Sequence, residues 1–129
     1  MASGVETILK EDAFLVSETN AKGTIIFANQ QFCNIAEYNL EELINQAHNI
    51  VRHNDMPKAA FKDLWDTVKE GRTWQGFVKN RTASNGYYWV FATVYPYKNI
   101  DGEQCYMSIR RKPSREDVQK YSELYKTMH

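Results

Sequence analysis

Residues 87–95 constrain the fold more than any other segment, because both faces of this predicted strand are apolar. One face carries Tyr87, Trp89, Phe91 and Tyr95, and the other carries Tyr88, Val90, Ala92 and Val94. An antiparallel strand with one face in water alternates apolar and polar side chains. We therefore expect both faces to be covered, one by helices and the other by a terminal helix or a second copy of the chain.

The surrounding segments predict the rest of a sheet. Asn85-Gly86 is a strong signal for a tight hairpin turn, and it follows residues 74–82, where the pattern has a period of two. Pro96 is expected to end the central strand. Three further segments have strand patterns: residues 12–18, 23–28 and 104–110.

Short helices are predicted between the two groups of strands. One spans residues 30–36, and a later one carries Pro57 in its first turn and ends at Gly71. The expected N-caps are Asn29, Asn39 (with Glu42 in a capping box), Asn54 or Asp55, and Ser114, which opens a final helix. Strands, helices and strands in this order predict an α+β fold, with a five-stranded antiparallel sheet, short helices on one face and a C-terminal helix.

Composition narrows the functional classes. The 129 residues fit one domain, and 16 basic against 16 acidic side chains argue against nucleic-acid binding or a polybasic membrane surface. The sequence has no apolar run long enough to span a bilayer and no secretory signal. Two cysteines are too few for a disulfide framework, so a reducing cytoplasm is expected. The sequence also lacks the common phosphate-loop, nucleophile-elbow and zinc-protease motifs, so we do not expect an enzyme. Cys33 and Cys105 are expected to be buried, inert thiols.

Charge is unevenly distributed along the chain. Residues 79–112 carry six basic side chains and two acidic ones: Lys79, Arg81, Lys98, Arg110, Arg111 and Lys112 against Asp101 and Glu103. A solvated face is one interpretation. The other is a basic rim of the sheet that meets an acidic partner or ligand.

A dense polar cluster at residues 48–57 is the main candidate binding loop. It contains His48, Arg52, His53 and Asp55. Arg52 offers a forked donor for phosphate, and the N–H groups of the helix that follows add an anion-binding dipole. His53 could stack on a base or form a hydrogen bond with it. A solvated loop with a helix cap is the alternative.

Asn80 is the second candidate, because it shares a predicted strand face with Trp74 and Val78. A buried amide requires hydrogen-bond partners, either in the backbone or at the edge of a planar, heteroatom-rich ligand such as flavin. Trp74 is a core residue or a wall of that pocket. Asn29 is a helix cap or a second amide for the same ligand.

Three stretches resemble the PAS domains of the aerotaxis-receptor family: residues 48–61, residues 74–81, and residues 86–90 with 106–110. The resemblance extends over about residues 10–112. It implies a PAS fold that binds FAD and reports redox state to the chemotaxis machinery. The family's flavin-binding positions correspond to Arg52, His53 and Asp55 in the loop, Trp74 and Asn80 on the sheet, and Asn29 at the first helix. His48, in the first of these stretches, is a further candidate for contact with the cofactor. Asn54 stands where relatives often have proline.

The same resemblance implies a domain organisation and partners. Residues 1–112 form the sensory domain, and residues 113–129 form a signalling or linker helix. A HAMP or chemoreceptor signalling unit is expected in cis or in trans, and a homodimer through the sheet or the terminal helices. The domain would then be cytoplasmic, or held near a membrane by a partner or by a further segment of chain. A change in hydrogen bonds at Asn80 or Asn29 would pass through the sheet to the N-terminal segment or the last helix.

Alternatives remain at this stage. A haem-based gas sensor would use His53 or His48 as the iron ligand. A dimerisation module without cofactor would use the aromatic strand faces as its interface. A flavin reductase has no supporting nicotinamide motif, and a flavin–cysteinyl photosensor is disfavoured because the candidate loop contains no cysteine.

Overall fold

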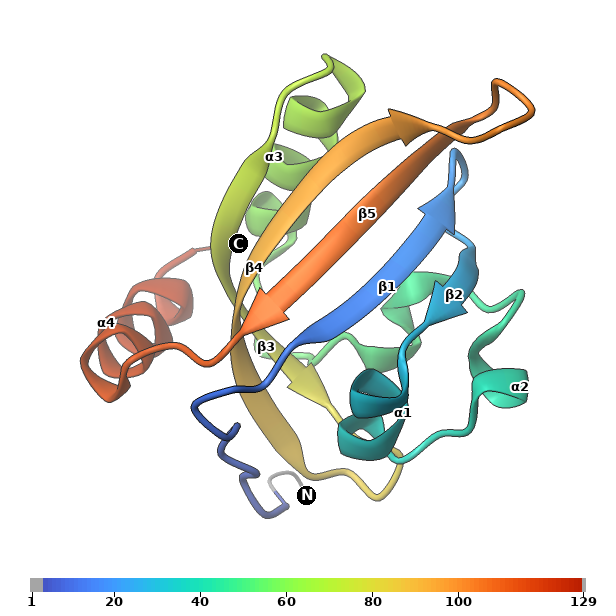
Figure 1. The fold of residues 1–129 in the computed structure, drawn as a ribbon. Helices are drawn as coiled ribbons and strands as arrows, with labels where there is room; N and C mark the ends of the chain where they lie inside the picture. Colours follow the sequence, from blue (N-terminus) through green and yellow to red (C-terminus); the bar gives the residue numbers. More distant parts are fainter. Residues whose placement is uncertain (1–3, 129) are drawn as a thin grey trace.

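The computed structural model describes residues 4–128, in which five strands form one antiparallel sheet (Figure 1). The strand order is β2-β1-β5-β4-β3, which confirms the predicted fold class. The strands are β1 Leu15–Asn20, β2 Ile25–Ala28, β3 Trp74–Arg81, β4 Tyr87–Lys98 and β5 Gln104–Arg111. The helices are α1 Gln30–Ala36, α2 Leu40–Leu43, the 3₁₀ turn η1 His48–Val51, α3 Lys58–Lys69 and α4 Arg115–Lys126.

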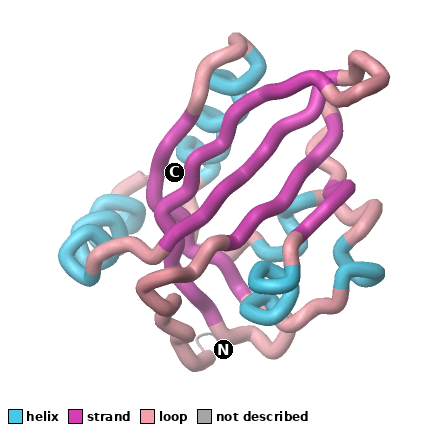
Figure 2. The backbone as a smooth tube through the Cα atoms, in the orientation of Figure 1, coloured by secondary structure: helices cyan, strands magenta, loops and turns pink. Residues whose placement is uncertain are grey.

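The main core lies between the inner face of the sheet and α1, α2, η1 and α3. Phe32 of α1 and Leu43 of α2 are fully buried there, as are Tyr88 and Val90 of β4. Burial of these side chains is the chief source of stability for such a layer. The outer face of β1 and β5 has no helix of residues 4–128 across it, as Figures 1 and 2 show.

Helix α4 covers the outer face of the sheet at β3 and β4. Tyr121 stacks on Phe77 with ring centroids 4.5 Å apart, and Tyr125 stacks on Trp89 at 6.1 Å. The Tyr125 hydroxyl also donates a hydrogen bond to the carbonyl of Phe77 over 2.7 Å. The expectation that a terminal helix covers the second face of the apolar strand is therefore confirmed at this end of the sheet.

A pairing absent from our sequence prediction joins the two ends of the chain. The N–H of Tyr87 donates to the carbonyl of Val5 (3.1 Å), and the N–H of Thr7 donates to the carbonyl of Tyr87 (2.8 Å). Between them, Glu6 forms a bidentate ion pair with Arg115 of α4, at 2.8 and 3.2 Å. The N-terminal segment thus holds the start of β4 and the first turn of α4 together.

Several predicted element boundaries are confirmed. Asn29, Asn39 and Ser114 each accept a backbone hydrogen bond as N-caps, and Asn39 forms the expected capping box with Glu42. Gly71 has φ +87° after α3, a conformation that favours glycine at a helix C-terminus. The first strand lies at residues 15–20 rather than 12–18.

The predicted start of the third helix is wrong. Neither Asn54 nor Asp55 caps it; Pro57, with φ −72°, is the N-cap, and α3 begins at Lys58. Proline already fixes the backbone for this position, and the Asp55 carboxylate is instead paired with Lys79 over 2.6 Å. Residues 48–51 of the candidate binding loop form the 3₁₀ turn η1.

Pro96 does not end the central strand, which continues to Lys98. Strand β3 pairs with β4 only as far as Val94, which lies opposite Trp74. Beyond that point β5 is the only strand of residues 4–128 that pairs with β4, with Pro96 opposite Tyr106. A proline is tolerated where its missing N–H falls on an open strand edge, so the strand continues past it.

Trp74 joins the end of β3 to α3 rather than filling the space between sheet and helices. Its indole N–H donates to Asp63 over 2.9 Å, and its side chain is buried. The ring lies over Gly76, where an added Cβ would overlap it. Glycine at position 76 is therefore required by packing.

We expect Gly76→Ala to lower the free energy of unfolding by about 1–3 kcal/mol, because the new methyl group overpacks against Trp74. Adding Trp74→Leu should relieve this clash, so the double variant should lose less stability than the two single losses combined. Denaturant unfolding of the four proteins measures this coupling. Additive losses would show that Trp74 is not the group that excludes a side chain at position 76.

Candidate functional site: a cationic cavity against the inner face of the sheet

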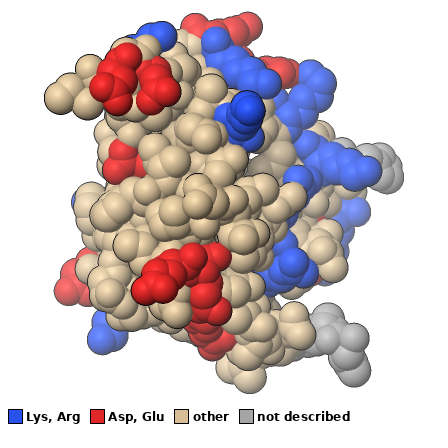
Figure 3. Space-filling view, turned by 90° about the vertical axis from the view of Figure 1, so that its right-hand side faces the viewer, with Lys and Arg blue, Asp and Glu red and all other residues tan. Residues whose placement is uncertain are grey.

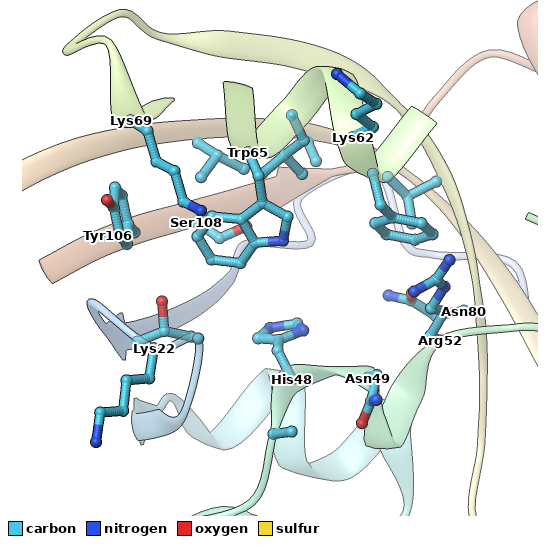
Figure 4. Close-up of a pocket in the computed structure, with 18 of the residues that line it drawn as sticks. Lys22, His48, Asn49, Arg52, Lys62, Trp65, Lys69, Asn80, Tyr106 and Ser108 are labelled. Carbon is cyan, nitrogen blue, oxygen red and sulfur yellow. The ribbon is translucent and has the colours of Figure 1, made fainter. Parts of the chain in front are cut away.

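A cavity of about 610 Å³ lies between α3, η1 and the inner face of the sheet (Figure 4). This volume falls in the usual range for small-molecule sites. Tyr106, Ser108 and Arg110 of β5 form part of one wall, and α3 contributes Phe61, Leu64 and Trp65 opposite. Because Val78 and Asn80 of β3 also line it, the predicted inward orientation of that strand face is confirmed.

The lining is strongly cationic although the chain has no net charge. Six basic side chains line the cavity: Lys22, Arg52, Lys58, Lys62, Lys69 and Arg110. No Asp or Glu of the described part of the chain is among the lining residues. Figure 3 shows lysine and arginine side chains gathered on one side of the molecule. Such a field attracts anionic ligands.

Arg110 is the most unusual group in the wall, because it is 4% exposed and no carboxylate of the described residues pairs with it. Its Nη2 donates to Ser17 Oγ over 2.9 Å and to His48 Nε2 over 2.8 Å. Its guanidinium lies 4.8 Å from the centre of the Phe32 ring. Its Nη1 is buried and has no hydrogen-bond partner among the described residues. Burial lowers the pKa of Arg110 to about 10, so it stays charged at neutral pH.

His48 is held neutral beside this cation. Enclosure in the wall, and then the Arg110 charge, lower the pKa of His48 to about 3. Because Nε2 accepts from Arg110, the ring proton of the neutral histidine resides on Nδ1. Ser17 Oγ lies 3.0 Å from the same Nε2. His48 thus serves as the acceptor that the buried guanidinium needs.

Asn80 and Arg52 lie together at another part of the cavity. Asn80 is 4% exposed, and its Nδ2 donates a long hydrogen bond of 3.4 Å to Tyr88 Oη. Residues 52 and 80 pair as an isolated antiparallel bridge. The Arg52 guanidinium lies 3.9 Å from the centre of the Phe61 ring, which leaves its polar edge available to an anion. The loop residue expected to bind phosphate therefore does line the cavity, near the start of α3.

His53 and Asp55 are not brought to the cavity. The loop passes around the edge of β3, so that these side chains lie on the outer side of the sheet. The His53 ring packs edge-on against Tyr87 at 6.1 Å, and Asp55 pairs with Lys79. The hydrogen bond that Lys79 donates, and then its charge, hold the pKa of Asp55 below its usual value.

Asn29 and Trp74 also lie outside the lining. Asn29 uses Oδ1 to accept from the N–H groups of Phe32 and Val16, both at 3.1 Å, and uses Nδ2 to donate to the carbonyl of Phe14 at 2.8 Å. Its polar atoms are engaged in capping α1 and tying it to β1. Of the seven candidate residues, His48, Arg52 and Asn80 thus share the cavity.

Other lining residues were missed in the sequence. The expected basic rim at residues 79–112 contributes only Arg110 to the lining, and the lysines come from residues 22–69 instead. Trp65 of α3 is one of these lining residues: it is half-buried in the cavity wall, edge-on to Tyr106 at 5.3 Å. One signal was available: Tyr106, Ser108 and Arg110 alternate with apolar side chains along one strand. That alternation marks a polar interior face once the cavity is known.

The fold and this cavity define a PAS domain, and the family model of the PAS fold matches residues 25–109. The chain belongs to this family. It is 42% identical over 123 residues to the aerotaxis receptor of Escherichia coli strain K12, which covers 95% of this chain and 24% of that receptor. It is 28% identical over 106 residues to a nitrogen fixation regulatory protein of Klebsiella oxytoca, over 81% of this chain and 21% of that protein. The chain thus spans about a quarter or less of these relatives.

Solved structures support the same fold. A light-oxygen-voltage domain studied with a flavin analogue superposes with a TM-score of 0.73 at 13% identity, over 85% of this chain and 84% of its own. The light-state structure of the blue-light photoreceptor Aureochrome1 LOV gives 0.70 at 16% identity, over 86% and 87%. At this identity the likeness concerns the fold alone.

None of the helices within residues 4–128 is both long enough and apolar enough to cross a membrane. No group of three or more His, Cys, Asp or Glu side chains in that part of the chain is arranged to hold a metal ion. The predicted domain bounds include residues 1–3 and 129, which lie outside the described residues.

We expect the ligand-free protein to lose stability as the pH falls below about 6.5, the pKa of an unperturbed histidine. Between pH 6.5 and about 3 the unfolded chain binds a proton at residue 48 that the folded protein excludes. The free energy of unfolding should fall there by up to about 1.4 kcal/mol per pH unit from this group. His53, whose pKa burial and Lys79 also lower, adds to the slope.

Denaturant unfolding at several pH values, on wild type and His48→Asn, measures this contribution. The variant should show a shallower loss, because residue 48 no longer titrates. Equal slopes in the two proteins would assign the pH dependence to other groups.

Proposed function

We propose that the cavity binds FAD and that the domain is a redox sensor of the energy-taxis type. The observation that carries the proposal is the buried Arg110, whose Nη1 has no partner, in a wall that lacks carboxylates among its described residues. A relative of this chain at 42% identity is named an aerotaxis receptor. FAD matches the cavity chemically, since it combines a planar ring edge rich in oxygen and nitrogen with an anionic diphosphate.

Different lining residues suit different parts of FAD, because their chemistry differs. Asn80 and the free Nη1 of Arg110 suit the polar edge of the ring, because both are buried and offer donors. Arg52 and the lysines of α3 suit the diphosphate, because they are cationic and near the start of a helix. Trp65, Phe61 and Leu64 provide apolar contact area. Bound FAD supplies reversible electron transfer, while the protein supplies orientation and charge.

The energetic reason for a ligand at Arg110 is the cost of its charge. A cation taken out of water needs an opposite charge or a full set of hydrogen bonds, and Arg110 has a neutral histidine and a serine. An acceptor atom of a ligand at Nη1 would complete this set. Binding of that ligand should therefore stabilise the folded protein by mass action.

The proposed signal begins at the hydrogen bonds of Arg110 and Asn80. Arg110 lies on β5, which pairs with both β1 and β4, and β4 carries the contacts to α4. A change in the redox state of the flavin would change its hydrogen bonds with Arg110. The arrangement of the sheet and α4 that interacts more favourably with the new redox state would then gain population, to the extent that the difference in interaction energy allows. We propose a HAMP or chemoreceptor signalling unit as the receiver, in cis or in trans, with homodimers formed through the sheet or terminal helices. The proposed role is that of a sensor rather than an enzyme. The proposed location is the cytoplasm.

The absorption spectrum of the freshly purified protein tests the cofactor. We expect flavin bands at about 375 and 450 nm, and FAD as the molecule released on denaturation. A sharp band at about 400–430 nm would instead indicate haem on histidine, and it would overturn the proposal. The alternative without cofactor predicts protein absorption alone, even after FAD is added.

Two neighbouring arginines provide a matched test of the site. Arg110 faces the cavity, whereas Arg111 lies over the Phe14 ring at 4.9 Å on the outer face. We expect Arg110→Met to weaken FAD binding about 10-fold or more, since a hydrogen bond to a charged group contributes roughly 1.5–3 kcal/mol. Arg111→Met should leave FAD affinity unchanged. Equal affinity in both variants would remove Arg110 from the site.

A further inference from the structure

The loop at residues 52–56 divides its side chains between the two sides of the sheet. Arg52 pairs its backbone with Asn80 and lines the cavity. His53 and Asp55 contact Tyr87 and Lys79, whose side chains lie on the outer face of β3 and β4. The loop therefore wraps around the edge of β3, with the ligand side and the anchoring side on opposite faces.

The anchoring side is a connected set of contacts, which we call the edge clamp: His53, Asp55, Lys79 and Tyr87. Lys79 Nζ lies 2.6 Å from Asp55 Oδ2 and 4.5 Å from the centre of the Tyr87 ring. The His53 ring packs against the same tyrosine, and its Nδ1 accepts from the N–H of Asp55 over 3.0 Å. Each member of the clamp thus contacts at least one other.

Burial makes the central ion pair stronger than an ordinary surface pair. The Lys79 side chain is 15% exposed, while that of Asp55 is 66% exposed. If Asp55 were lost, the enclosed Lys79 ammonium would remain without its carboxylate, which costs more than a broken surface pair. The N–H of Lys79 also donates to Met56 Sδ over 3.3 Å, so the loop is tied to β3 at a second point.

We propose that His53, Asp55 and Lys79 are positioning residues of the flavin site: they hold the loop so that Arg52 and His48 face the cavity, without touching the ligand. This inference rests on the proposed function. It differs from the expectation drawn from the resemblance, in which His53 and Asp55 contact FAD. Small displacements of a charged donor weaken hydrogen bonds steeply. Loss of the edge clamp on the outer face should therefore weaken ligand binding in the cavity on the inner face.

The two roles make opposite predictions for a charge exchange. A carboxylate that contacts the ligand cannot be replaced by a lysine, whatever stands at position 79. A carboxylate that only pairs with Lys79 can be exchanged with it, because the pair survives in reversed order. The variants are therefore Asp55→Lys, Lys79→Asp and the two together.

FAD titration of the flavin-free proteins measures the outcome. We expect each single variant to weaken FAD binding about 10-fold or more, and the exchanged pair to recover to within about threefold of wild type. Single variants that bind FAD like wild type, or an exchanged pair no better than the worse single variant, would overturn the inference. Wild-type protein that binds no flavin would instead refute the proposed function.

A matched pair elsewhere serves as control. Lys112 and Glu11 have the same 2.6 Å separation, with side chains 24% and 89% exposed, and neither lines the cavity. Glu11→Lys, Lys112→Glu and their combination should leave FAD affinity within about twofold of wild type. A loss as large as that at the clamp would mean that any broken ion pair impairs binding, which would overturn the inference.

Amide exchange in the flavin-free protein gives a readout that does not depend on the ligand. The single variants should speed exchange at residues 52–56, and the exchanged pair should restore protection. If the charge reversals fail to fold, Asp55→Asn and Lys79→Arg replace them. Asp55→Asn should weaken binding, and Lys79→Arg should retain it because the pair persists; unchanged exchange and affinity in Asp55→Asn would overturn the inference.

Discussion

A buried guanidinium that shares its hydrogen bonds between a serine and a neutral histidine organises the interior of this domain. Arg110 brings β5 against Ser17 of β1, His48 of η1 and the Phe32 ring of α1. One cation of β5 thus contacts three other elements from distant parts of the chain. The neutrality of His48 follows from it, since a second charge at this distance would be strongly unfavourable. The polar character of the cavity wall derives from this arrangement.

Local signals predicted most of the fold. Asn85-Gly86, the capping box at Asn39 and the two apolar faces of β4 each depend on residues close in sequence, and all three are confirmed. The Arg110 network could not be predicted in this way, because its partners are 62 and 93 residues away in the sequence. No periodic pattern in the sequence indicates that Arg110, Ser17 and His48 come together before the sheet order is known.

The predicted site shows the same difference between what local sequence signals can and cannot predict. Asn80 could be placed inside because strand alternation assigns it to the face of Val78. The loop residues could not be sorted, since the side on which each lies depends on how the loop turns around the edge of β3. Adjacent residues in a sequence stretch can therefore serve opposite faces of a sheet. A resemblance in sequence identifies such a stretch but does not show which of its residues contact the ligand.

The proline within β4 has a consequence for how this sheet can associate. Beyond Val94, one edge of β4 has no strand of residues 4–128 beside it. In other sheets such an edge can pair with a strand from another chain and begin aggregation. Pro96 has no N–H to offer there, and Lys98 places a charge at the end of the strand. This end of the sheet is therefore a poor template for intermolecular strand addition. The domain can carry a long, aromatic central strand and still resist uncontrolled polymerisation along that edge.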